Sequence, residues 1–311
     1  MMPSRRSPVE REGRAGRGLS APWSPLRLRG HQERALVGVL MALPALAFFA
    51  AFAIYPILRV FYLSLFEYNL TSPERWIGLG NFAYLFADPT FKAAVVNTAV
   101  YVVGTYLPTI VLALLIAIGL NHRSHVAGVL RTIYFVPVAM TWVVVTIMWH
   151  LIYNRFGLLD QLLHLHTNWL TDGTWAPLAL IIMSVWKEVG FFVIIFLAGL
   201  QSIRHDIYEA AAVDGAGPLR IQLHVTLPLL RPVLAVATIF AVIRGMQAFT
   251  PQYVLTDGGP GDATQVINLL VYKTAFVYAE MGRASAIAVL MFGALLVMTL
   301  LQLRIFRARS A

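Results

Sequence analysis

Six long apolar segments alternate with shorter polar segments along this chain. A helix needs about 20 largely apolar residues to cross the hydrocarbon core of a bilayer, and each of these segments is long enough. The connections between them are rich in Asn, Asp, Gly and Pro, residues typical of turns where backbone meets water. The pattern predicts an all-α, polytopic membrane protein with six transmembrane helices, at roughly residues 35–62, 94–120, 130–153, 176–200, 233–255 and 284–306.

The composition agrees with this prediction and excludes several classes of protein. Of the 311 residues, 59% are hydrophobic and only 13% are charged, which is too apolar for an ordinary soluble domain. The absence of Cys excludes disulfides and thiolate metal sites. The pair His164 and His166 has no carboxylate pair nearby in the sequence, so we expect a solvated loop there and no metal site.

Basic residues are concentrated near the N-terminus. The first 34 residues hold eight Arg among Ser, Pro and Gly, without apolar periodicity, and we expect residues 1–34 to be a disordered tail. A cleaved signal peptide is less favoured, because the apolar stretch that follows, 35–65, is longer than the ~7–15 residues of a signal peptide's apolar region. Since the basic residues do not share one folded face, a nucleic-acid partner is not expected.

The distribution of Lys and Arg also predicts an orientation. Sixteen of them lie on the side of the N-terminal tail and five on the opposite side. Basic loops favour the cytoplasmic side of a membrane. We therefore expect both termini in the cytoplasm, including a short C-terminal tail at 307–311, together with the loop between the fourth and fifth spans.

That loop, residues 202–228, is a polar island with its own local pattern. Apolar residues at helical spacing from Ser202 to Val213 predict a short amphipathic helix, and Asp214-Gly215 supplies a turn. Gly217-Pro218 can start a second short helix with Pro in its first turn, which we expect Leu227-Pro228 to end. Two short helices at an angle form a knuckle that can insert into a groove on a partner.

The stretch from Glu209 to Pro228 resembles the EAA loop of ABC-importer permeases. Further phrases resemble the sugar permeases of that group, which contains maltose and glycerol-3-phosphate uptake subunits: Ile77–Phe82, Arg131–Pro137, Ile195–Gln201 and the segment that starts at Tyr253. The resemblance implies a type I ABC importer permease over residues 35–306, in a prokaryotic inner membrane. It implies that the following residues couple the chain to an ATPase: Glu209, Ala210, Ala211, Asp214, Gly215, Leu227 and Pro228.

The same resemblance implies three partners besides the bilayer: a second permease subunit, an ATP-binding cassette ATPase dimer and an extracytoplasmic substrate-binding protein. The chain itself cannot supply a Walker A loop, because its three Lys follow Phe, Trp and Tyr, so no G-K-[ST] is possible. We therefore expect this subunit to hold no cofactor and not to be an enzyme, with ATP and Mg²⁺ bound by the partner ATPase.

Three charged residues fall well inside the fourth and fifth predicted spans: Lys187 and Glu188 in the fourth and Arg244 near the middle of the fifth. Each would cost about 2.5–3.5 kcal/mol or more if it faced lipid at the bilayer centre. Either Glu188 pairs with Lys187 or Arg244 to hold helices together, or these groups line the substrate pathway. For Arg244 the pathway is the favoured interpretation.

Sugar sites combine aromatic faces with hydrogen-bonding groups. By the resemblance, the third to fifth spans should line the pathway, which gives these candidates: Trp142, Ser184, Lys187, Glu188, Phe191, Arg244, Gly245 and Gln247. Gly245 and Ala248 stand where the maltose-type pattern has amides, so maltose itself is doubtful.

The leading hypothesis is a permease for a sugar or oligosaccharide that works by alternating access. The second is uptake of glycerol-3-phosphate or a related phosphodiester, for which Arg244 and Lys187 would supply cationic groups. The third is a six-span membrane enzyme or receptor without an ATPase, although the sequence has neither H-E-x-x-H nor G-x-S-x-G.

Overall fold

The computed structural model describes residues 31–121, 125–155, 157–164 and 167–307. The chain divides into two units, residues 1–56 and 57–311, which are described separately. Most of the predicted N-terminal tail and residues 308–311 of the C-terminal tail lie outside the described residues. The first described helix begins at His31, so residues 31–34 are helical although they were assigned to the tail.

The first unit is the beginning of the first predicted span. Helix α1 (His31–Phe49) continues through a π-helical turn, η1 (Ala50–Ile54), into α2 (Tyr55–Leu63), which enters the second unit. In the π turn the backbone N–H of Tyr55 donates to the carbonyl of Ala50, five residues earlier. The turn directly precedes Pro56, which has no N–H to continue the α-helical pattern, so the backbone widens there without breaking.

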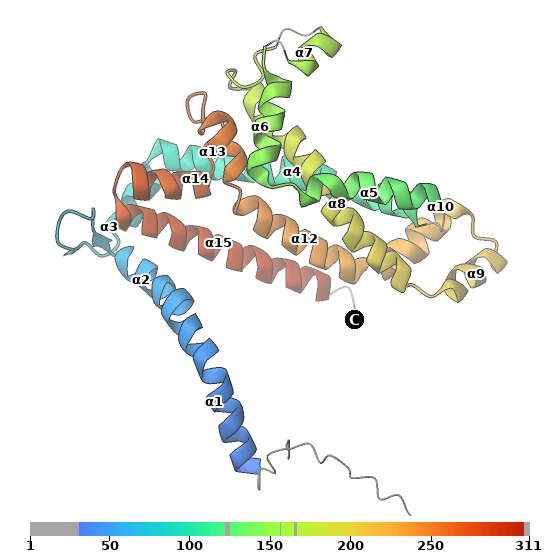
Figure 1. The fold of residues 1–311 in the computed structure, drawn as a ribbon, viewed down its shortest axis with the longest axis horizontal. Helices are drawn as coiled ribbons and strands as arrows, with labels where there is room; N and C mark the ends of the chain where they lie inside the picture. The colour runs from blue at the N-terminus through green and yellow to red at the C-terminus, as the bar shows by residue number, and fades with distance from the viewer. Residues whose placement is uncertain (1–30, 122–124, 156, 165–166, 308–311) are drawn as a thin grey trace, which may run out of the picture. The chain divides into compact units, whose positions relative to one another are not determined.

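The second unit opens with a two-stranded ribbon and a short helix. Strand β1 (Phe66–Glu67) pairs antiparallel with β2 (Arg75–Trp76), and α3 (Gly80–Ala87) follows. The remaining elements are all helical (Figure 1): α4 (Pro89–Leu120), α5 (His125–Ala139), α6 (Trp142–Tyr153), α7 (Leu158–Leu163), α8 (Trp175–Ser202), α9 (His205–Val213), α10 (Pro218–Ile221), η2 (Gln222–Thr226), α11 (Leu227–Leu229), α12 (Arg231–Met246), α13 (Thr250–Thr256), α14 (Ile267–Tyr272), η3 (Lys273–Val277) and α15 (Met281–Arg307).

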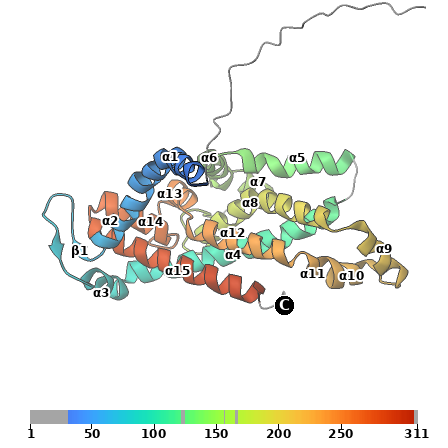
Figure 2. The same ribbon diagram turned by 90° about the horizontal axis from the view of Figure 1, so that it is seen from below.

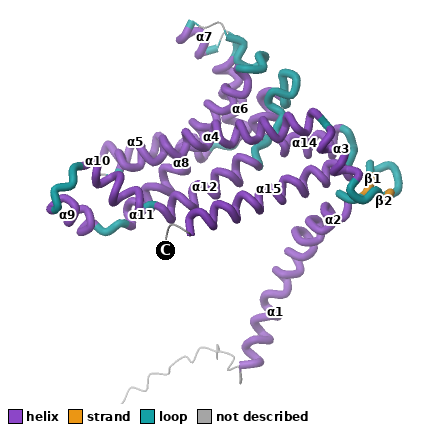
Figure 3. Tube along the Cα trace, turned by 180° about the vertical axis from the view of Figure 1, so that it is seen from behind, coloured by secondary structure: helices purple, strands orange, loops and turns teal. Residues whose placement is uncertain are grey.

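Helix α8 is the centre of the second unit. It packs against α4, α5 and α12, as Figure 3 shows from behind. Its residues Phe192 and Phe196 are fully buried against small residues of α4, such as Ala113. At Gly190 a Cβ atom would lie only 2.0 Å from the backbone oxygen of Tyr134, so the backbones of α5 and α8 touch where glycine allows it.

Five of the six predicted spans are helices in the described part of the chain that are long and apolar enough to cross a membrane. The third was predicted as one helix over 130–153, and this is wrong, because α5 and α6 meet at 100° and form either a broken span or a re-entrant loop. Two local features explain the break. Pro137 removes a backbone donor near the end of α5, and Thr141, in an extended conformation, caps α6 by accepting from the Val144 N–H at 3.4 Å.

Candidate functional site

A cavity of about 340 Å³ lies where two spans are interrupted. It is lined by Trp142, at the start of α6, and by the irregular residues between α12 and α13, with α4 and α8 completing the wall. Non-helical backbone at membrane depth is tolerated where it lines a cavity, because water or a ligand can satisfy its polar groups. The full lining is Tyr101, Tyr106, Trp142, Glu188, Arg244, Gln247, Ala248, Phe249, Thr250 and Pro251.

An ion pair forms part of the cavity wall. Nη1 of Arg244 donates to Oε2 of Glu188 at 2.5 Å, and the guanidinium carbon lies 4.1 Å from the ring centre of Phe191. The Glu188 side chain is only 3% exposed, whereas that of Arg244 is 40% exposed. The two interpretations of these charges are therefore compatible: the pair joins α8 to α12, and both of its members face the cavity.

Lys187 has a different environment. Its Nζ donates to the backbone carbonyls of Pro137 at 2.9 Å and Val138 at 3.2 Å, and lies 5.4 Å from the ring centre of Trp142. These carbonyls are at the end of α5. Because the helix breaks there, no following helical turn supplies backbone N–H groups to bond to them. Lys187 therefore supports the broken span, and the partner of Glu188 is Arg244.

Two further candidates lie in packed helix contacts and not in the cavity lining. Ser184 is fully buried and accepts a hydrogen bond from the Tyr101 hydroxyl at 2.9 Å, which joins α8 to α4. At Gly245 a Cβ atom would lie 2.8 Å from Val102 and 2.9 Å from Tyr106, so this glycine lets α12 approach α4. Phe191 acts on the site through its contact with the Arg244 guanidinium.

Of the eight predicted pathway residues, the structure brings four to the cavity: Trp142, Glu188, Arg244 and Gln247. Tyr101 and Tyr106, on the second predicted span, were not predicted to line the cavity, and neither were Phe249, Thr250 and Pro251. Two features of the sequence point to these residues. Polar and aromatic side chains recur through the otherwise apolar α4 segment, and Pro251, four residues after Gln247, indicates an interruption of the fifth span.

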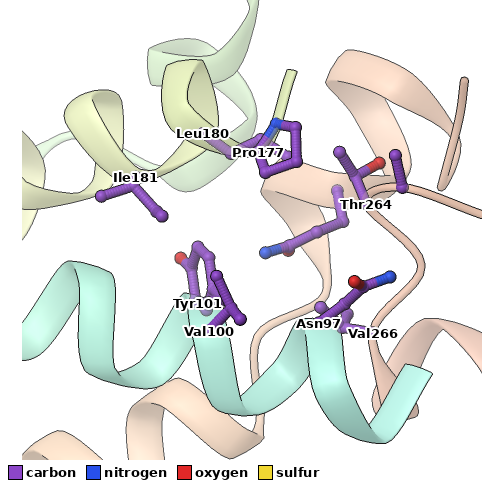
Figure 4. A pocket seen from close by; sticks show the side chains of 10 residues that line it. Asn97, Val100, Tyr101, Pro177, Leu180, Ile181, Thr264 and Val266 are labelled. Atoms are coloured by element: carbon purple, nitrogen blue, oxygen red, sulfur yellow. The ribbon is translucent and has the colours of Figure 1, made fainter. Parts of the chain in front are cut away.

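Figure 4 shows a second, smaller cavity, whose lining includes Tyr101. Tyr101 also lines the first cavity. The smaller cavity's volume of about 70 Å³ has room for roughly two water-sized molecules. Beside it, Nδ2 of Asn97 donates to the backbone oxygens of Asp262 at 2.6 Å and Gln265 at 3.1 Å. These bonds hold the loop after α13 on α4, and thereby hold the end of the interrupted span.

The predicted knuckle is present between α8 and α12. Helix α9 ends at Val213, Gly215 adopts a left-handed φ of +75°, and α10 begins at Pro218 after Gly217. The second helix was predicted to end at Leu227-Pro228, and it ends at Leu229, one residue later. The chain remains helical to Leu229, because the π turn η2 lets the Leu227 N–H bond to the carbonyl of Gln222.

The knuckle carries exposed apolar side chains. Val213 is 87% and Leu219 73% exposed, and Leu223 is also exposed. The predicted coupling residues Glu209 and Asp214 are exposed beside them, and Glu209 lies 3.7 Å from His205 one turn earlier. Figure 2 shows α9 and α10 at one end of the second unit, beyond the packed helices. An exposed apolar patch rimmed by charges is typical of a protein contact surface.

The chain is similar in sequence to permease proteins of known transport systems. The chain is 37% identical over 284 residues to the trehalose/maltose transport system permease protein MalF of Thermococcus litoralis, covering 89% of this chain and 96% of the relative. It is 32% identical over 283 residues to the sulfoquinovosyl glycerol transport system permease protein SmoG of Agrobacterium fabrum, covering 88% and 92%.

The probable ABC transporter permease protein YurN of Bacillus subtilis is 34% identical over 285 residues, covering 88% of this chain and 97% of the relative. A solved bacterial ABC transporter involved in the import of the acidic polysaccharide alginate contains a chain of the same fold. That match has a TM-score of 0.78 at 24% identity and covers 89% of this chain and 96% of that chain.

A family model matches residues 109–310, which include α5 to α15, the interrupted spans and the knuckle. The match covers more than half of the chain, and the six apolar segments agree with a multi-pass membrane protein. The chain therefore belongs to the family of binding-protein-dependent transport system inner membrane components.

Proposed function

We propose that this chain is the permease subunit of an ATP-driven importer for a sugar or oligosaccharide, and that it works by alternating access. The observation that carries the proposal is the cavity at the two interrupted spans. It combines aromatic faces, from Tyr101, Tyr106 and Trp142, with the polar groups of Glu188 and Gln247. Such a set suits the apolar faces and hydroxyl rim of a sugar ring. Several relatives are permeases named for sugar transport, which supports the same substrate class.

Three partners belong to this proposal, and the family and the exposed knuckle support them. A binding protein delivers the substrate, a second permease completes the pathway, and an ATPase dimer binds the exposed apolar residues of α9 and α10. Glu209, Asp214 and Gly215 lie within this surface, where motion of the ATPase would reach α8 and α12 directly. A solved structure of similar fold is a bacterial alginate ABC transporter in complex with a periplasmic protein bound to an alginate pentasaccharide.

In this proposal both termini and the knuckle are cytoplasmic. The excess of Lys and Arg on that side supports the orientation. Within the second unit, α15 ends toward the same end of the bundle as the knuckle (Figure 2). Arg304, near the end of α15, and the basic residues of the knuckle therefore lie on one side, as the orientation requires.

An acidic substrate is the second candidate. It is favoured by Arg244, whose guanidinium faces the cavity and is partly exposed although it is paired with Glu188. A substrate carrying a sulfonate, carboxylate or phosphate could bind the outward N–H groups of the guanidinium. This candidate includes the glycerol-3-phosphate class.

The proposal is tested with the transporter reconstituted in proteoliposomes with its cognate binding protein. A thermal-shift screen of the binding protein against neutral and acidic sugars identifies the substrate, and uptake of that substrate is then measured. Trp142→Leu should impair uptake, while Trp76→Leu, at an exposed position outside the cavity, should not. Equal uptake in both variants would contradict the assignment of the cavity. Absence of a stoichiometric ATPase after mild-detergent purification would favour the enzyme or receptor alternative.

A further inference from the structure

An apolar groove lies in the second unit between α4 and α15, and it shares no lining residue with the candidate substrate cavity. It has a volume of about 330 Å³, and it is lined mainly by one face each of α4 and α15, with Phe86, Met246 and Ile267 completing the lining. On α4 the lining recurs every three or four residues, at Phe91, Val95 and Val102, and on α15 it does so at Ile287 and Met298 with others between them. Val95 and Met298 are exposed, so the groove opens sideways, toward lipid in a bilayer.

The length of the groove matches one leaflet. The lining spans residues 91–103 of α4 and 287–298 of α15. With a rise of 1.5 Å per residue, these spans correspond to roughly 18 and 17 Å. Half of a hydrocarbon core is about 15 Å thick. The groove therefore accommodates a chain that enters from one membrane surface and ends near the bilayer centre.

A polar cavity of about 200 Å³ adjoins the groove at the end where α4 and α15 begin, and Ile287 lines both. Its wall includes Asp88, Glu280 and Arg283. Nη1 of Arg283 donates to Oε1 of Glu280 at 2.6 Å, and the guanidinium carbon lies 3.9 Å from the ring centre of Tyr84. The Arg283 side chain is 34% exposed, so its remaining N–H groups can meet a ligand.

We propose that the groove and the polar cavity together form a binding site for one phospholipid whose headgroup carries both a phosphate and an ammonium group. The apolar groove receives an acyl chain, and Arg283 donates to the phosphate. The polar cavity is lined by two carboxylates, Asp88 and Glu280, and one guanidinium, that of Arg283; Asp88 also accepts a hydrogen bond from the Thr90 N–H at 3.0 Å. This balance favours an ammonium group, which donates hydrogen bonds to carboxylates, and disfavours a headgroup with only negative charge.

The occupant is a lipid and not a protein helix for two reasons. Arg283 and Glu280 already pair with each other, so a helix would engage this polar cavity only by placing a cationic and an anionic side chain there together, whereas a phosphoethanolamine headgroup supplies both charges at one point. The groove also ends after about one leaflet, whereas a spanning helix packs over the whole ~30 Å of the hydrocarbon core.

The test uses the full-length chain, purified with its co-expressed transporter partners in mild detergent and analysed by native mass spectrometry. The wild type should retain phosphatidylethanolamine in preference to phosphatidylglycerol. Ala99→Phe fills the groove and should lower retention, while Val96→Phe, an exposed position on α4 outside the lining, should not. Arg283→Gln should weaken phosphatidylethanolamine binding roughly ten-fold, the effect of losing a charge-assisted hydrogen bond. Arg75→Gln, at an exposed ion pair, is the control.

A second measurement does not depend on the variants. Delipidated wild-type transporter in detergent is titrated with a phosphatidylethanolamine that carries a photoreactive group on its acyl chain, and the labelled peptides are mapped. Labelling within residues 91–103 or 287–298 supports the site. Retention unchanged in Ala99→Phe, equal binding of phosphatidylglycerol, or labelling confined to other surfaces would overturn it. A crosslink between Met291→Cys, in the groove, and a segment of another protein would also overturn the proposal. Because the chain has no other Cys, such a crosslink can be assigned to this position.

Discussion

The ion pair between Glu188 and Arg244 allows a quantitative prediction, because its two members are buried to different extents. Arg244→Gln leaves a carboxylate that is 3% exposed without its cationic partner, whereas Glu188→Gln leaves a guanidinium that is 40% exposed and can still meet water. Breaking a fully buried pair costs about 3–5 kcal/mol. We expect a cost of roughly 3 kcal/mol for Arg244→Gln, since the amide can still donate one hydrogen bond, and roughly 1–2 kcal/mol for Glu188→Gln.

The double variant, Glu188→Gln with Arg244→Gln, separates the free energy of the ion pair from the other contributions of the two side chains to stability. With both charges removed, two amides can hydrogen-bond across the same gap, so we expect a cost near that of Glu188→Gln alone and a coupling of roughly 2 kcal/mol between the positions. The measurement is the melting temperature of the purified transporter for both single variants and the double. The exposed pair of Arg75 and Glu67 is the control, where the same cycle should give about 0–1 kcal/mol.

Uptake by the same variants tests the substrate. If Arg244 contacts the substrate, Arg244→Gln should reduce uptake of an acidic substrate severely and that of a neutral sugar mildly, since Gln can still bond to hydroxyls. Two results would refute the reasoning on stability: a larger loss for Glu188→Gln than for Arg244→Gln, or losses that simply add in the double variant. Unchanged melting together with unchanged uptake in Arg244→Gln would reject both roles of this residue.

Three further predictions concern the knuckle, the helix packing and the tail. Gly215→Pro cannot adopt the native φ of +75°, so it should uncouple uptake from ATP hydrolysis while the chain still inserts. The control is Gly217→Pro, which should be tolerated because the native φ is −68°. Equal activity of the two variants would contradict a coupling role for this turn. Gly190→Ala places a methyl group against a backbone oxygen of α5 and should lower the free energy of unfolding by at least about 1–3 kcal/mol in a thermal melt, whereas Gly293→Ala has open space and should not destabilise. Deleting residues 2–26 should leave uptake in proteoliposomes unchanged, because the segment lacks apolar periodicity; a loss despite normal insertion would reveal a role for the tail.

The chemistry of the residues predicts which charged side chains avoid lipid, but their positions in the sequence do not predict which partner each of them contacts. A charge within an apolar span must face something other than lipid, so Glu188 and Arg244 could be identified without a structure. The same argument applies equally to Lys187, yet its Nζ bonds to the carbonyls of Pro137 and Val138. Which partner each charge finds depends on how the helices rotate and where α5 breaks, and neither is encoded in the spacing of one helix.

The sequence by itself determined the elements that depend on local patterns: the number and approximate bounds of the apolar segments, and the knuckle, whose Gly215 and Gly217-Pro218 impose their backbone conformations locally. Only the tertiary structure decided that the third span bends by 100°, that a cavity lies where this bend meets the α12–α13 interruption, and that Tyr101 and Tyr106 of α4 line it. The physical reason is that hydropathy reports transfer from water to an apolar environment, and lipid and a helix neighbour are equally apolar. The face that a span turns toward a cavity is set by packing between helices far apart in the chain.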